Sequence, residues 1–140
     1  MGIEKRDQPR IPITAEALLA VLVPDETFSP NYVRGVATDI SLSGVRVKSY
    51  QLTREDYHRL IRGVNFAKLN LTLPYVEEPV ELRARIVWVE FHDRKAGDPP
   101  HCVLGLKFER LGQAATVRLQ YVLNRLGADS YETVRMIDPT

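Results

Sequence analysis

Short segments with a period of two, separated by turn-forming residues, constrain the fold of this chain more than any other feature. Segment 69–73 alternates leucines with polar residues, and segment 80–88 alternates apolar residues with glutamate and arginine. Similar alternation or short apolar runs occur in segments 11–23, 32–40, 45–48 and 102–108. Because successive side chains of a strand point to opposite faces, each segment presents one apolar face. The sequence therefore predicts about six strands, each buried on one side.

Two segments depart from this period and have helical features. Residues 53–62 form a predicted short helix, which begins with a capping-box spacing at Thr53 and ends at Gly63, where we expect a left-handed stop. From about residue 113, apolar residues recur at helical spacing, and Gly127 is expected to end this second helix. The tail at 128–140 fits either a further turn of helix or a strand.

The order of these elements indicates the fold class. A run of short strands with one small helix between them and a helix at the end predicts a mainly β protein, an antiparallel barrel or sandwich with a packing helix. Closure of the sheet into a barrel would remove the edges that short strands expose. The chain has 140 residues, which suits one domain. We expect that domain at 11–127, a flexible segment at 1–10 and a tail at 128–140.

The composition excludes several classes of function. The chain is 44% apolar and 26% charged with a net charge of +1, so its overall charge does not favour a nucleic-acid polymer as partner. We find no secretory signal, no apolar run long enough to span a membrane and a single cysteine, which together predict a cytoplasmic protein. No nucleophile motif and no phosphate-binding glycine loop occurs, so we expect a protein that is not an enzyme and has no cofactor.

Two arginines near the N-terminus are the first candidate for a binding site. Arg6 and Arg10 are four residues apart and directly precede the first predicted strand. A guanidinium forms two parallel hydrogen bonds with a phosphate or with the O6/N7 edge of guanine, so the pair suits an anionic ligand. The alternative is a solvated basic terminus, which is a common feature of proteins.

The connection between the second and third predicted strands is the second candidate. It reads Asp39-Ile-Ser41-Leu-Ser-Gly44. A carboxylate accepts the N1–H and N2–H₂ donors of guanine, a serine hydroxyl donates or accepts, and glycine allows positive φ or the close approach of a flat ring. The alternative is an ordinary turn in which Asp39 and Ser41 bond to their own backbone. Taken together with the arginines, this connection complements both the acceptor and the donor groups of a guanine nucleotide.

The spacing Arg6-x-x-x-Arg10, followed by Asp39-x-Ser41-x-x-Gly44, resembles the double signature of PilZ domains. The predicted strands at 84–91 and 103–111, the second of which contains a glycine and a phenylalanine, resemble the later part of such a domain, and the likeness covers about residues 5 to 125. The resemblance implies a six-stranded antiparallel β-barrel that binds the bacterial second messenger cyclic di-GMP.

The resemblance also implies roles for individual residues. Arg6 and Arg10 are expected to clamp guanine acceptor edges and phosphates, Asp39 and Ser41 to meet the donor edge, and Gly44 to leave room for the base. Lys5 stands where an arginine is often found, which leaves both one and two ligand molecules per chain open. Arg46, just after the glycine, is a further candidate for phosphate contacts.

A receptor of this kind would be non-catalytic. We expect the N-terminal segment to close over the ligand and so change the surface shown to an unidentified downstream protein, with an output in motility, biofilm formation, virulence or pili. The chain is expected to be a monomer or homodimer without membrane insertion. Two alternatives remain at this stage: an adaptor of pilus or motility machinery that works without nucleotide, and a small barrel that binds single-stranded nucleic acid.

Some aromatic and metal-ligating residues have a simpler interpretation. The residues Trp88, Phe66, Phe91 and Phe108 are expected in the core, and the strand arginines Arg83 and Arg85 in solvent. The residues His92, His101 and Cys102 match no zinc spacing, so no metal site is predicted.

Overall fold

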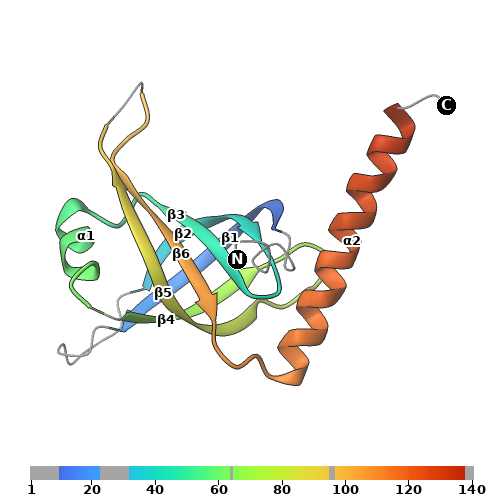
Figure 1. The fold of residues 1–140 in the computed structure, drawn as a ribbon, viewed down its shortest axis with the longest axis horizontal. Coiled ribbons are helices and arrows are strands. Elements are labelled where there is room, and N and C mark those ends of the chain that lie inside the picture. Colours follow the sequence, from blue (N-terminus) through green and yellow to red (C-terminus); the bar gives the residue numbers. More distant parts are fainter. Residues whose placement is uncertain (1–9, 23–31, 64, 95–96, 138–140) are drawn as a thin grey trace, which may run out of the picture.

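The structure is a computed structural model that describes residues 10–22, 32–63, 65–94 and 97–137, with the backbone alone for 128–137. It contains six strands and two helices. The two helices lie on opposite sides of the barrel that the strands form (Figure 1). The elements in chain order are β1 (Ile11–Leu22), β2 (Tyr32–Ile40), β3 (Gly44–Ser49), α1 (Arg54–Leu60), β4 (Asn65–Thr72), β5 (Val80–His92), β6 (His101–Phe108) and α2 (Gln113–Ile137).

The strands form a closed antiparallel barrel in the order β1-β2-β3-β6-β5-β4. The long strand β1 closes it by pairing with β2 along one edge and with β4 along the other. The prediction of a six-stranded antiparallel barrel is thus confirmed. Closure gives each of the six described strands a neighbour on both sides over at least part of its length, which reduces the edge that is open to further pairing.

The alternating apolar residues of all six strands meet inside the barrel. Residues that are at most 1% exposed include Leu19, Ile40, Val45, Val47, Leu69, Leu71, Val80, Leu104 and Leu106. Cys102 is buried in the same core, where desolvation raises the pKa of its thiol to about 11. The period of two that the sequence shows therefore corresponds to a continuous interior.

Helix α1 has the predicted start. The Thr53 side chain accepts a hydrogen bond from the backbone N–H of Asp56, whose carboxylate accepts from the backbone N–H of Thr53 in return. The predicted stop is wrong: the helix ends at Leu60, Ile61 caps it in right-handed geometry, and Gly63 does not have positive φ. The side chain of Asn65 donates to the Leu60 carbonyl at 2.9 Å and so satisfies this end of the helix.

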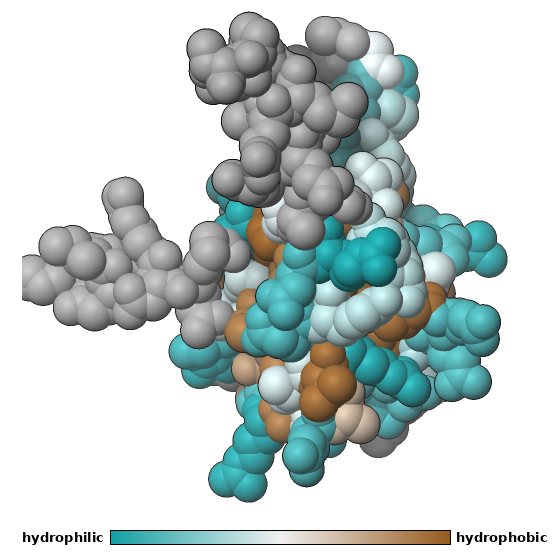
Figure 2. All heavy atoms as spheres, turned by 90° about the vertical axis from the view of Figure 1, so that its right-hand side faces the viewer, coloured by the Kyte–Doolittle hydropathy of each residue, from teal (hydrophilic) through white to brown (hydrophobic). Residues whose placement is uncertain are grey.

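Helix α2 is longer than the sequence predicts. Its buried residues Leu119, Val122 and Leu123 belong to the barrel core, as the helical periodicity indicates. The prediction that Gly127 ends this helix is wrong, because α2 continues to Ile137. A single glycine costs a helix only about 1 kcal/mol relative to alanine, so it does not stop a helix that the neighbouring residues favour. On the side where α2 lies, hydrophilic side chains surround separate hydrophobic patches (Figure 2).

The prediction that Trp88 lies in the core is also wrong. In the pairing of β5 with β6, Ile86 lies opposite Leu106 and Trp88 lies opposite Gly105, so β5 has one extra residue at Val87. This bulge shifts the alternation by one position. Val87 is therefore exposed, Trp88 lies half-buried on the outer face, and Phe91 packs against Tyr57 of α1.

Candidate functional site

Asp39 lies near the end of β2, where the register places it between Pro12 of β1 and Arg46 of β3. The Arg10 guanidinium donates a hydrogen bond from Nη1 to Asp39 Oδ1. The Nε atom of Arg46 lies 3.6 Å from the other carboxylate oxygen. We call these three residues the Arg10–Asp39–Arg46 cluster. The structure thus brings together one arginine of the N-terminal motif, the predicted acid and the additional candidate Arg46.

Arg46 connects this cluster to an aromatic ring that the sequence interpretation missed. Its guanidinium lies 5.5 Å from the centroid of the Trp88 ring. Gly105, between them on β6, allows this arrangement, because a Cβ atom there would lie 2.2 Å from Trp88 Nε1. A glycine in the middle of a strand is a sign of close approach, so Gly105 was the signal that could have revealed the outward Trp88.

Beside Trp88 the surface is hollowed. The hollow has a volume of about 670 Å³, and its lining residues come from β3, β5 and β6: Arg46, Trp88, Glu90, His92 and Val103. A volume of this size lies within the usual range for small-molecule sites. The hollow and the Arg10–Asp39–Arg46 cluster share Arg46, so they form one continuous polar surface on the outside of the barrel.

Ser41 has a structural role in the turn. It is 1% exposed, and its hydroxyl oxygen accepts hydrogen bonds from the backbone N–H groups of Ser43 and Gly44 at 3.1 and 3.2 Å. Its own backbone N–H donates to the Gly44 carbonyl at 2.9 Å. These are the bonds expected of the alternative stated above, in which Ser41 belongs to an ordinary turn and bonds to the nearby backbone. The hydroxyl therefore fixes the loop that carries Asp39, and it does not face the solvent from which a ligand would come.

Gly44 is required for a reason other than positive φ. Among the described glycines only Gly97 has positive φ. A Cβ atom on Gly44 would lie 2.3 Å from the carbonyl oxygen of Leu106, on the neighbouring strand β6. The Phe108 N–H also donates to the Ser43 carbonyl at 2.8 Å, which ties the turn to the same strand. Gly44 thus allows β3 to begin in close contact with β6.

The remaining two predicted residues, Lys5 and Arg6, lie outside the described residues. Their roles stay predictions. Arg10 is the first described residue, and its side chain is exposed enough (44%) for a ligand to reach it.

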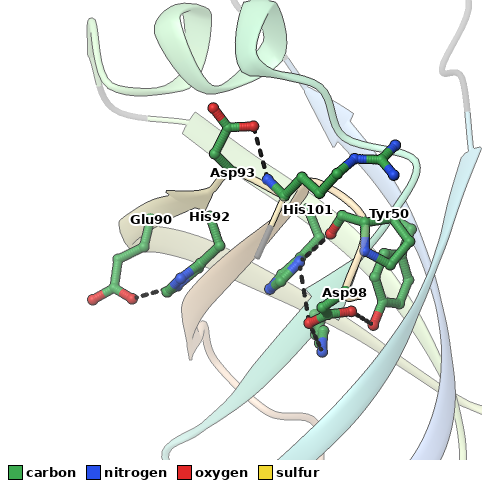
Figure 3. Close-up of polar contacts among 9 residues, drawn as sticks. Tyr50, Glu90, His92, Asp93, Asp98 and His101 are labelled. Atoms are coloured by element: carbon green, nitrogen blue, oxygen red, sulfur yellow. Dashed lines mark hydrogen bonds and ion pairs between the residues drawn. The ribbon is translucent and has the colours of Figure 1, made fainter. Parts of the chain in front are cut away.

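A second polar group surrounds the connection from β5 to β6 (Figure 3). Tyr50 donates to Asp98 at 2.8 Å, and this hydrogen bond, with the nearby Lys48 ammonium, holds the pKa of the Asp98 carboxyl below its ordinary value. The His92 and His101 rings stack at 5.0 Å, and His101 Nδ1 donates to the Pro99 carbonyl at 2.9 Å. The contacts of Lys48 and Tyr50 with Asp98 attach the connection to the end of β3, and the histidine contacts attach it to β5 and β6.

Neither a metal site nor a membrane span is found among the described residues. Cys102 is buried in the core, whereas His101, itself 7% exposed, stacks against the exposed His92. No described group of three or more His, Cys, Asp or Glu residues is arranged to hold a metal ion. Within the part of the chain that the structure describes, neither helix has the length and apolar composition needed to cross a membrane.

Comparison with known proteins is informative at the level of structure. No protein-family model matches the chain, and no curated protein matches it. The chain is similar to the solved structure of the PilZ domain of YcgR from Escherichia coli with c-di-GMP. The two are 14% identical, the match covers 94% of this chain and 98% of that chain, and the TM-score is 0.65.

Two further solved structures are similar. The PilZ domain of CeSA from a cellulose-synthesizing bacterium is 20% identical, with 82% of this chain and 97% of that chain covered and a TM-score of 0.52. The PlzA protein of Borreliella burgdorferi in complex with c-di-GMP is 11% identical, with 91% and 55% covered and a TM-score of 0.54. Similarity at these identities concerns the fold, and this chain therefore has the fold of a PilZ domain.

Proposed function

We propose that this chain binds cyclic di-GMP on the outside of its barrel and acts as a non-catalytic receptor. The observation that carries the proposal is the Arg10–Asp39–Arg46 cluster beside the hollow at Trp88. Guanine has hydrogen-bond acceptors on its O6/N7 edge and donors at N1 and N2. The cluster offers guanidinium donors and a carboxylate acceptor within one site, so it matches both edges of the base.

The ion pair between Arg10 and Asp39 has to open for the ligand, and the energies permit this. An exposed ion pair contributes about 0.2–1 kcal/mol, whereas a bidentate contact between an arginine and guanine contributes about 1–3 kcal/mol. The side chains of Arg10 and Arg46 are both close to half exposed. Replacement of the Arg10–Asp39 ion pair by contacts with guanine is therefore favourable. Before the ligand arrives, the ion pair keeps the guanidinium donors and the carboxylate acceptor close together.

Trp88 and Arg46 extend the proposed site toward the hollow. The Trp88 ring lies against Gly105 and gives the hollow an apolar wall, against which a base or the ribose can pack. Arg46 lies between this wall and Asp39, so its guanidinium is placed to bind a phosphate oxygen.

The proposed output is a change of surface. Residues 1–9, which include Lys5 and Arg6, directly precede Arg10, and closing of this segment over the ligand would present a new surface to a downstream protein. Ordering the segment would consume part of the binding energy. Ser41 and Gly44 support the site indirectly, because they shape the turn that follows Asp39.

Calorimetric titration tests the proposal. We expect the protein to bind cyclic di-GMP with a Kd of about 1 μM or tighter, which corresponds to about 8 kcal/mol. GTP and cyclic di-AMP serve as controls, and we expect Arg10→Ala to weaken binding about tenfold or more, because it removes one guanine contact. The heats also give the number of ligand molecules per chain. Folded protein that gives no heat with cyclic di-GMP would contradict the proposal and favour a nucleotide-independent adaptor.

A further inference from the structure

A groove separate from the Arg10–Asp39–Arg46 cluster lies along the outside of β4 and β5. It has a volume of about 750 Å³ and runs between these strands and the connection from β6 to α2. The backbone N–H of Glu109 donates to the Arg83 carbonyl at 2.8 Å and holds this connection against β5. The far wall of the groove is therefore fixed by a backbone hydrogen bond between the connection and the barrel.

Basic side chains lie along the groove and beside it, and they stand directly opposite one another on neighbouring strands. Lys68 of β4 lies directly opposite Arg83 of β5, and Arg85 of β5 lies directly opposite Lys107 of β6. Like charges in directly opposite positions destabilise a sheet. All four side chains are exposed, and none of them makes an ion pair with another described residue. Two acids also line the groove, but neither forms an ion pair with these four side chains, so an acidic partner would relieve the remaining repulsion.

The groove also has an apolar side, which narrows the kind of partner. Leu111 and Ala115, from the connection and the start of α2, are partly buried, and Tyr32 contributes a ring that is 51% exposed. Two acids, Glu81 and Glu109, also line the groove. They would repel a uniformly anionic bilayer or nucleic acid, whereas a protein segment can place apolar and neutral residues beside them.

We propose that this groove binds an extended acidic segment of a partner protein. An apolar side chain of that segment packs against Tyr32, Leu111 and Ala115, and its carboxylates bind the basic side chains. Arg83 and Arg85 are two residues apart on one face of β5, which separates them by about 6.6 Å. Alternate residues of an extended segment have the same repeat, so glutamates at every second position match both arginines.

A labelled peptide tests this inference independently of nucleotide binding. The probe has one central leucine with glutamates at alternate positions on both sides, and its binding to the full chain is followed at low salt by fluorescence polarisation and amide NMR shifts. We expect saturable binding, shifts at Arg83, Glu109 and Leu111, and about tenfold weaker binding by Arg83→Glu, because reversal replaces attraction by repulsion.

The matched control is Arg94→Glu, which makes the same change of charge on an exposed residue outside the groove. It should leave binding nearly unchanged, and Arg83→Gln should give an intermediate loss if the folded spectrum is retained. Equal weakening by Arg94→Glu, or equal binding of a peptide with serine in place of leucine, would overturn the inference. If phosphatidylserine vesicles or a single-stranded oligonucleotide bound with the same dependence on Arg83 and the peptide did not bind, a different partner class would replace it.

Discussion

Asp39→Ala is expected to lower the affinity for cyclic di-GMP by about 10- to 100-fold. The substitution removes the acceptor for the guanine N1 and N2 donors, a contact of about 1–3 kcal/mol. It also removes the common partner that holds the guanidiniums of Arg10 and Arg46 in place before the ligand arrives. Calorimetric titration of the variant, compared with the unmodified protein at the same salt concentration, measures the effect. The fold should be unaffected, because this carboxylate lies on the outside of the barrel.

Asp93→Ala is the matched control for this variant. Asp93 likewise pairs with an arginine, at 2.7 Å from Arg54 Nη2, but its side chain is 66% exposed against 18% for Asp39, and it lies on the connection after β5 and not in the proposed site. The control should bind the ligand as the unmodified protein does. If both variants lost affinity to the same degree, the effect would be one of overall charge. If Asp39→Ala bound normally, Asp39 would have no contact with the base.

Gly44→Ala is expected to lower the free energy of unfolding by about 2–4 kcal/mol, because the new Cβ atom would lie 2.3 Å from a backbone carbonyl oxygen of β6. That oxygen belongs to Leu106 in the β3–β6 pairing, so neither strand can move away without disturbing the barrel. A loss of this size is a large part of the usual stability of a domain. Urea unfolding followed by circular dichroism measures it.

The control for this prediction is an alanine at a glycine with open space. A Cβ atom on Gly127 would meet no atom within 4 Å, and the residue lies inside α2. Gly127→Ala should therefore raise the free energy of unfolding by up to about 1 kcal/mol, through helix propensity. Destabilisation of the same size by both variants would show that the close approach of β3 and β6 is not the cause.

Sequence periodicity was sufficient for the strands and for a barrel or sandwich, because a buried face imposes a period of two on every strand, and the resemblance to PilZ domains decided for the barrel. The helix ends were less predictable. Gly63 and Gly127 are both plausible stops by residue type, but the true ends depend on Asn65 at one helix and on the continuing helical preference of the chain at the other. The end of a helix thus depends on tertiary contacts and on the summed helix propensity of several residues rather than on a single residue.

For the candidate site, the charged residues that lie together were predictable from the sequence, and the shape of the surface around them was less so. Asp39, Arg10 and Arg46 converge because strand register brings them together, and their chemistry was visible in the sequence. The position of Trp88 was harder to predict, because one extra residue in β5 reverses the alternation and only Gly105, on the neighbouring strand, gives a sign of it. Ser41 shows the opposite case: its residue type suits a ligand, but the turn uses its hydroxyl.

The bulge in β5 has a spectroscopic consequence. The chain contains one tryptophan, and the extra residue at Val87 turns it from the interior to the surface beside Arg46. Its indole emission therefore comes from the edge of the proposed site alone, without a second fluorophore of the same kind elsewhere in the chain. A guanine that stacks near this ring would change the emission directly, so the protein contains an intrinsic optical reporter for occupancy of the hollow.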